Sequence, residues 1–204
     1  MTDNVATAAA DLTGAAKEFA RTGVAHVQGL VPHPVAVYLA SVMSVMSVMH
    51  GAGRLTSDES QVPGAFVVYG DPAFDTLLPL LALPMSRITA VELQPTYSFA
   101  RTYLEGQELT KHRDRPACQY SVTVHLGSSD DQPWPIELTD TTGAHRSVEL
   151  LPGDGLAYLG CELSHWRAPC PSQWYSQAFL HYVDGTDRDL IFDGRASLGR
   201  ARSA

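Results

Sequence analysis

The first half of the chain carries its hydrophobic residues at helical spacing. Leu12, Ala16 and Phe19 recur on one face of an alanine-rich segment, which predicts an amphipathic helix. Pro32 is typical of a helix start and Gly51 of a helix end, and the triplet Ser-Val-Met occurs three times between them. The expected elements are a helix over 5–21, a strand over 24–27, a helix from about 32 to 51 and a short buried helix, broken by prolines, over 76–86. Residues 55–75 show turn signals and no clear period.

From about residue 89 the pattern changes to short apolar runs separated by Gly, Pro and Asp. Runs of this length and spacing predict the strands of a sandwich or barrel. The expected strands cover 90–94, 96–104, 118–127, 133–138, 146–151, 155–160, 165–168 and 174–183. Helices followed by many strands indicate an α+β fold with the helices packed on one sheet. We expect one domain over 1–204: helical support over about 1–88, a strand core over about 89–184 and an irregular tail over 185–204, disordered from 199.

Charge and cysteine content narrow the class of partner. The chain has 204 residues and a formal net charge of −8, which disfavours nucleic acid and anionic lipid as partners. Three cysteines without a C-x-x-C pair predict neither a disulfide framework nor a zinc knuckle, so a reducing, cytoplasmic setting is expected. We expect no signal peptide and no membrane-spanning stretch of 18 apolar residues. The oligomeric state stays open.

The motif that carries chemistry is His112-x-Asp114 followed much later by His165. Residues i and i+2 of a strand share a face, so His112 and Asp114 are expected to point at one spot. A second histidine from a distant strand completes a set of two imidazoles and one carboxylate. This set binds iron(II) and leaves coordination positions open, as in non-haem oxygenases. His-x-Asp alone is a weak signal, and the alternative is a surface His and Asp without a metal.

The surrounding residues resemble the 2-oxoglutarate- and iron(II)-dependent oxygenases. The resemblance covers about 97–184 and is carried by YLEGQELTKHRD, the Pro152-Gly153-Asp154 turn, SHWR and the closing run QAFLHYVD. It implies a double-stranded β-helix, which is a jelly roll, with iron(II) on His112, Asp114 and His165. It also implies 2-oxoglutarate and dioxygen as co-substrates and a substrate that loses a hydrogen atom.

One position departs from the family pattern. Family members place a cation about ten residues past the distal histidine to hold the far carboxylate of 2-oxoglutarate, and here Tyr175 and Ser176 fall there. Arg167 is the expected substitute, because it shares a strand face with His165 and a guanidinium binds a carboxylate through two hydrogen bonds. By the same alternation, the further residues expected near 2-oxoglutarate are Tyr103, Arg101 and His125.

Asp114 also bears on the reaction. Halogenating relatives replace this carboxylate by a small residue, so the resemblance favours hydroxylation or a related oxidation such as desaturation or ring closure. We expect a small-molecule substrate, with candidate contacts at Arg115, Trp134, Trp166 and Tyr175. A protein hydroxylase of the same fold is one alternative. A cupin-like metal dioxygenase, isomerase or sensor that does not use 2-oxoglutarate is another.

Overall fold

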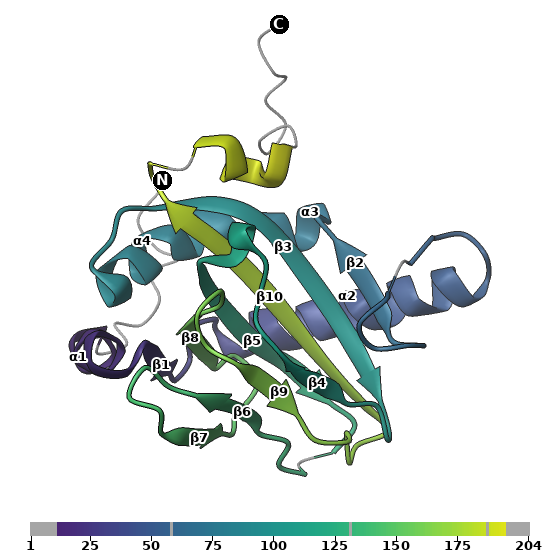
Figure 1. Cartoon of the computed structure of the whole chain (residues 1–204). Coiled ribbons are helices and arrows are strands. Elements are labelled where there is room, and N and C mark those ends of the chain that lie inside the picture. Colours follow the sequence, from purple (N-terminus) through teal and green to yellow (C-terminus); the bar gives the residue numbers. More distant parts are fainter. Residues whose placement is uncertain (1–11, 58, 131, 187, 195–204) are drawn as a thin grey trace, which may run out of the picture.

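Two antiparallel sheets face each other, and the helices cover the outer face of the larger one (Figure 1). The structure is a computed structural model that describes residues 12–57, 59–130, 132–186 and 188–194. The helices are α1 (Leu12–Thr22), α2 (His33–Gly51), α3 (Pro72–Asp75), α4 (Leu77–Thr89) and the 3₁₀ turns η1 (Pro116–Cys118) and η2 (Arg188–Gly194). The strands are β1 (Val24–Val27), β2 (Phe66–Tyr69), β3 (Leu93–Leu104), β4 (Leu109–His112), β5 (Tyr120–Ser128), β6 (Ile136–Thr139), β7 (His145–Val148), β8 (Gly155–Leu159), β9 (His165–Arg167) and β10 (Trp174–Asp184).

The strand order is that of a jelly roll. The larger sheet runs β1-β8-β5-β10-β3-β2 and the smaller one β4-β9-β6-β7. The two longest strands, β3 and β10, pair along most of their length at the centre of the larger sheet, with Tyr175 opposite Tyr103. The predicted α+β class with a jelly-roll core is therefore confirmed.

The helices pack on the larger sheet through one continuous apolar core. Met43 of α2 and Met85 of α4 are fully buried in it, together with Val122, Ala178 and Leu180 from the sheet. Burying side chains of this size stabilises the fold by roughly 1.5–3 kcal/mol each. The prediction that helices pack on one sheet is confirmed.

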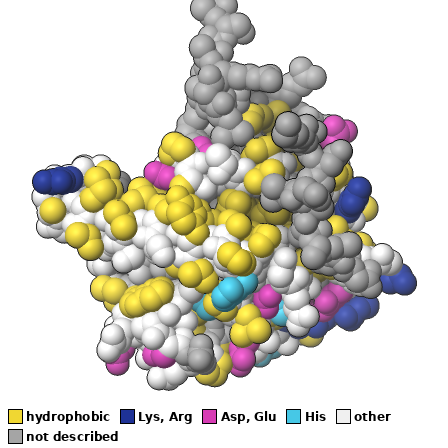
Figure 2. All heavy atoms as spheres, turned by 180° about the vertical axis from the view of Figure 1, so that it is seen from behind, with side chains coloured by type: hydrophobic (Ala, Val, Ile, Leu, Met, Phe, Trp, Pro, Cys, Tyr) yellow, Lys and Arg dark blue, Asp and Glu magenta, His cyan; other side chains and the backbone are white. Residues whose placement is uncertain are grey.

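Helix α2 keeps an apolar face toward solvent. Val37, Tyr38, Val45 and Val48 are 44–72% exposed, and Figure 2 shows hydrophobic side chains gathered on this side of the molecule. By length and composition α2 is able to cross a membrane, with a mean hydropathy of 1.4, so the expectation that no stretch of this kind exists was wrong. A core helix meets the same criterion, and α2 packs its other face on the sheet.

Several elements differ from the sequence prediction. Strand β2 and helix α3 lie in the stretch 55–75, which showed no pattern; β2 exists because it pairs with β3 from Phe66↔Thr102 to Tyr69↔Phe99. Helix α4 continues through Pro84, so the expected break at this proline was wrong.

The remaining differences lie at strand and chain ends. The two expected strands around Pro95 form the single strand β3, and the proline lies beside an irregularity in the β3–β10 register, where a strand tolerates it. The expected irregular tail contains the turn η2. Residues 5–11 of the first predicted helix and the segment 199–204 lie outside the described residues.

Candidate metal centre

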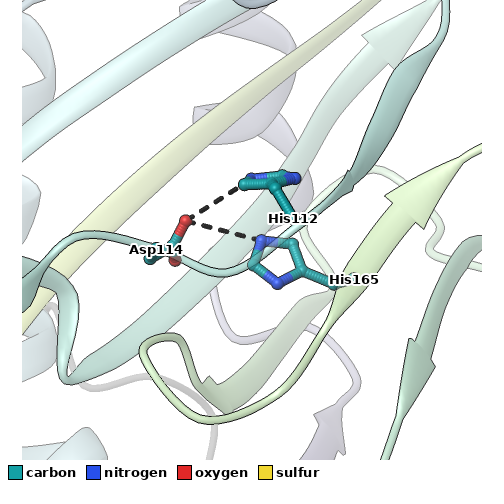
Figure 3. Close-up of side chains that lie close together, drawn as sticks. All are labelled: His112, Asp114 and His165. Atoms are coloured by element: carbon teal, nitrogen blue, oxygen red, sulfur yellow. Dashed lines mark ion pairs between the residues drawn. The ribbon is translucent and has the colours of Figure 1, made fainter.

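Strands β4 and β9 bring the two histidines of the motif together. They pair antiparallel with His112 directly opposite His165, and the ring centroids are 4.3 Å apart. Oδ1 of Asp114 lies 3.6 Å from Nε2 of His112 and 3.5 Å from Nε2 of His165. Figure 3 shows this one carboxylate oxygen turned toward both imidazoles. Ligand atoms about 2.1 Å from a shared ion stand roughly 3–3.5 Å apart, so this spacing fits a metal centre.

Backbone carbonyls fix the orientation of both imidazoles. Nδ1 of His112 lies 2.8 Å from the carbonyl oxygen of Thr110, and Nδ1 of His165 lies 3.0 Å from that of Leu163. A carbonyl oxygen only accepts, so each Nδ1 carries the proton and donates it. The lone pair of each neutral ring is then on Nε2, which faces the shared point. This is the second hydrogen bond that metal-binding histidines usually make.

Asp114 reaches the site from outside the strand. Strand β4 ends at His112, so the expectation that His112 and Asp114 alternate within one strand was wrong. The Asp114 amide instead donates to the carbonyl oxygen of Gly160 at 2.9 Å. A Cβ on Gly160 would lie 2.5 Å from Oδ2 of Asp114, so only glycine leaves room for the carboxylate here. Burial opposes ionisation of Asp114, but its contacts with His112 and His165 outweigh burial and hold its pKa below the usual range.

The triad opens into a cavity of about 580 Å³ between the two sheets. This volume is typical of small-molecule sites. The cavity combines aromatic side chains of the larger sheet, cationic side chains and a loop segment between α2 and β2. Besides the triad, the lining includes Glu59, Gln61, Tyr97, Phe99, Arg101, Arg115 and His181.

Arg101 lines this cavity, but its guanidinium is already occupied. It is buried, and it donates to Glu59 at 2.7 Å, to Gln61 at 2.9 Å and to the hydroxyl of Tyr103 at 2.9 Å. Glu59 in turn accepts from the backbone amides of Gln61 and Val62. Arg101 therefore fastens the segment 59–62 over the cavity, and these contacts use most of the five N–H donors of its guanidinium.

The guanidinium of Arg167 is buried, and one of its nitrogens makes no hydrogen bond with the described residues. It shares β9 with His165, as predicted, and is 2% exposed. Its Nη1 donates to the carbonyl oxygen of Trp134, the hydroxyl of Tyr175 lies within reach of the guanidinium, and Nη2 has no hydrogen-bond partner among the residues that the structure describes. The guanidinium carbon lies 4.5 Å from the ring centroid of Trp134 and 5.2 Å from that of Tyr175. Because buried polar groups are nearly always paired, Nη2 marks a place where a ligand oxygen is expected.

Further unpaired polar atoms belong to the strands behind Arg167. They are Oγ1 of Thr123, Nε2 of His125 and both amide atoms of Gln177, with Gln177 opposite His125 in the sheet. Nδ1 of His125 meets the carbonyl oxygen of Leu150 at 2.8 Å, so Nε2 is an acceptor and suits a water or a hydroxyl better than a carboxylate. The sequence analysis named His125 but not Gln177. A polar glutamine among the apolar residues of the last strand could have indicated Gln177 as a site residue.

The four residues that were predicted to contact the substrate lie in different parts of the structure. Arg115 lines the cavity, but its guanidinium is paired with Asp193 at 2.7 Å. Trp134 and Tyr175 are buried around Arg167 and are not among the residues that line the cavity. Trp166 lies outside the cavity lining: its ring stacks on His145 and lies 4.3 Å from Nζ of Lys111. The expectation that Trp166 borders the pocket was therefore wrong, because its neighbour His165 takes the inward position of β9.

A second group of candidate ligands overlaps the triad. Asp114, Cys118 and His181 also bring donor atoms close together. Burial raises the pKa of the Cys118 thiol to about 12, and its sulfur lies 3.0 Å from the hydroxyl of Tyr97. The thiolate that a metal needs is thus disfavoured, and the two histidines with Asp114 form the better site. Apart from their residue type, nothing in the sequence pattern indicated that Cys118 and His181 lie beside the triad.

Comparison with known proteins shows which solved structures share this fold. A scan against protein-family models found no match, and neither did a search of curated proteins. Among solved structures, the chain is similar to AviO1 from Streptomyces viridochromogenes Tue57 (TM-score 0.71, 18% identity, 88% of this chain and 97% of that one). It is similar to a Pseudomonas putida prolyl-4-hydroxylase (0.67, 16%, 85% and 98%). It is also similar to the epimerase SnoN in complex with Fe3+, alpha ketoglutarate and nogalamycin RO (0.67, 13%, 86% and 84%).

At these identities the likeness establishes the fold. The chain has the jelly-roll fold of the 2-oxoglutarate- and iron(II)-dependent oxygenases, and the resemblance drawn from the sequence is confirmed at that level. Within this fold, His112, Asp114 and His165 form a candidate metal centre.

Proposed function

We propose that the protein is an iron(II)- and 2-oxoglutarate-dependent oxygenase that oxidises a small molecule. The metal would be held by Nε2 of His112, Nε2 of His165 and Oδ1 of Asp114. When bound, iron(II) with 2-oxoglutarate and dioxygen supplies the oxidising power that removes a hydrogen atom from the substrate. The protein contributes a fixed ligand geometry, a buried anchor for the co-substrate and a walled cavity.

The observation that carries this proposal is the unpaired Nη2 of Arg167. A buried guanidinium with an unsatisfied donor costs stability unless a partner arrives. A carboxylate is the partner whose geometry a guanidinium matches best. Arg167 lies two residues from the ligand His165 on the same face of β9 but is not among the residues that line the cavity, so the proposal places a short dicarboxylate with one end at the metal and the other reaching behind the lining to Arg167. The amide of Gln177 and the hydroxyl of Thr123 add donors at the same end.

The fold alone does not determine which kind of oxidation the protein would carry out. The similar structures include a prolyl-4-hydroxylase and an epimerase. Hydroxylation is our first choice, because Asp114 keeps the carboxylate and the triad needs no further change. A small-molecule substrate is supported by the cavity volume and by the segment 59–62, which forms part of its wall.

The test is anaerobic addition of 2-oxoglutarate to the iron(II)-loaded protein. We expect a weak visible charge-transfer band that titrates with the ligand and is absent from a His112→Ala/His165→Ala variant. If iron(II) binds to the parent but no band appears, the co-substrate is wrong and a cupin-like metal protein becomes the better interpretation. If the double variant binds iron as well as the parent, the proposed metal centre is wrong.

A further inference from the structure

Ser121 contacts the carboxylate oxygen of Asp114 that points away from the histidines. Oδ1 faces the two imidazoles at 3.5 and 3.6 Å, whereas Oδ2 lies 3.2 Å from Oγ of Ser121. Ser121 is fully buried on β5. The two oxygens of one carboxylate therefore have different partners before any metal binds.

His181 determines which way the serine hydroxyl donates. Its Nδ1 lies 2.8 Å from Oγ of Ser121, and the ring is buried on β10 against Tyr97, with centroids 4.5 Å apart. A serine hydroxyl has one proton, and the carboxylate of Asp114 only accepts. When Nδ1 of His181 donates to Oγ, the hydroxyl proton goes to Oδ2 of Asp114 at 3.2 Å, which is the charged and the nearer of its two acceptors, the other being the carbonyl oxygen of Cys118 at 3.4 Å. The result is a chain from His181 through Ser121 to Asp114.

Gly160 closes the other side of the same oxygen. A Cβ at this position would lie 2.5 Å from Oδ2 and 2.7 Å from Oγ of Ser121, so the backbone of residue 160 packs tightly against the hydrogen-bonded pair. The amide of Asp114 is bound to the carbonyl oxygen of Gly160 as well. The carboxylate is thus fixed at its backbone and at Oδ2, and Oδ1 alone is left for the metal.

We propose that Ser121 and His181 are positioning residues that make Asp114 a one-oxygen ligand. The inference rests on the proposed function only in assuming a metal at the triad. Two imidazoles and one oxygen fill three positions of an octahedral ion and leave three open, enough for a two-point chelator and dioxygen. If Oδ2 were released, the carboxylate would chelate the ion through both oxygens and remove one of those positions.

The experiment compares Ser121→Ala with Ser121→Thr, which keeps the hydroxyl, using cobalt(II) alone as the probe. We expect Ser121→Ala to bind cobalt(II) with an affinity reduced less than about tenfold, but with an altered visible spectrum and one more oxygen neighbour by X-ray absorption. Ser121→Thr should match the parent. A parallel pair, His181→Leu and His181→Asn, tests the second link, because the asparagine amide still donates near the Nδ1 position. This pair carries the test if Ser121→Ala does not fold.

Binding of 2-oxoglutarate is a separate readout. On the cobalt(II) protein we expect it to be about tenfold weaker in Ser121→Ala and His181→Leu than in the parent. Should all variants keep the parent spectrum per bound cobalt, the inference is overturned, even where melting temperature or metal affinity falls. If the parent never binds 2-oxoglutarate, the proposed function fails, while a changed cobalt spectrum in Ser121→Ala still supports the role of Ser121.

Discussion

The guanidinium carbon of Arg167 lies 5.2 Å from the ring centroid of Tyr175. A cation from β9 thus stands beside the β10 residue that occupies the position where related oxygenases carry their own cation. Aromatic faces on two sides and the carbonyl oxygen of Trp134 hold the side chain in place. This position is the basis of our proposal that Arg167, from the smaller sheet, replaces the charge that the closing strand lacks.

This arrangement predicts how substitutions of Arg167 change co-substrate binding. Arg167→Met should raise the dissociation constant for 2-oxoglutarate by at least about 100-fold, because a buried carboxylate loses its partner. Arg167→Lys should have a smaller effect, about tenfold, since the charge stays but the paired donors are lost. Anaerobic titration of the iron(II) protein measures both. Arg87→Met, an exposed position on α4, is the matched control. An unchanged constant in Arg167→Met would move the anchor elsewhere.

Gly160→Ala should disturb the metal centre without touching a ligand. Its Cβ would lie 2.4 Å from the carbonyl oxygen of Cys118 and 2.5 Å from Oδ2 of Asp114, so the carboxylate has to move. We expect metal affinity to fall about 10- to 100-fold, as for other changes behind a ligand. Gly51→Ala, at an open position in the last turn of α2, should leave metal affinity unchanged. Cobalt(II) titration of the two variants compares them, and equal affinities would contradict the geometry.

The pair Glu59–Arg101 should behave as a buried charge pair. The exposed fractions of the side chains are 6% and 3%, so removing one partner leaves the other charge uncompensated. Glu59→Gln is expected to lower the free energy of unfolding by about 3–5 kcal/mol, and the amides of Gln61 and Val62 should exchange hydrogen faster. Adding Arg101→Gln to Glu59→Gln should cost less than the sum of the two single changes. Additive urea-unfolding results would show that the two residues are not coupled.

The lowered pKa of His125 predicts how the free energy of unfolding depends on pH. Burial, aided by the charge of Arg167, lowers its pKa to about 4, from 6.5 in an exposed histidine, against the opposite effects of hydrogen bonding to Leu150 and of Asp154. Between these values the unfolded chain binds a proton that the folded protein does not. The contribution of His125 to stability is thus full above pH 6.5 and falls as the pH decreases toward 4, by about 3 kcal/mol in total.

His125→Asn isolates this contribution, because the amide still donates toward Leu150 but does not titrate. Urea unfolding at pH 7 and pH 5 should show a smaller loss of stability on acidification in the variant than in the parent. Other buried histidines leave a residual slope in both proteins. Parallel curves for parent and variant over this range would rule out the buried neutral state of His125.

The sequence by itself determined the chemistry of the site and the class of fold. The short apolar runs predicted a sandwich or barrel, because strands follow a local period. The spacing of His112 and Asp114, the distant His165 and the resemblance to a known oxygenase family predicted the triad and the jelly roll. Even the choice of Arg167 followed from its two-residue spacing to His165.

Only the tertiary structure decided which partners these side chains have. Arg101 and Arg167 are the same residue type, yet Arg101 is paired with Glu59, 42 residues away, whereas Nη2 of Arg167 has no hydrogen-bond partner within the described part of the chain. His181 reaches Ser121 across 60 residues to orient Asp114. Strand β2 exists through its pairing with β3, and Trp166 faces away from the cavity. Hydrogen bonds and strand register between distant segments depend on how the sheets close, and local sequence patterns do not encode that closure.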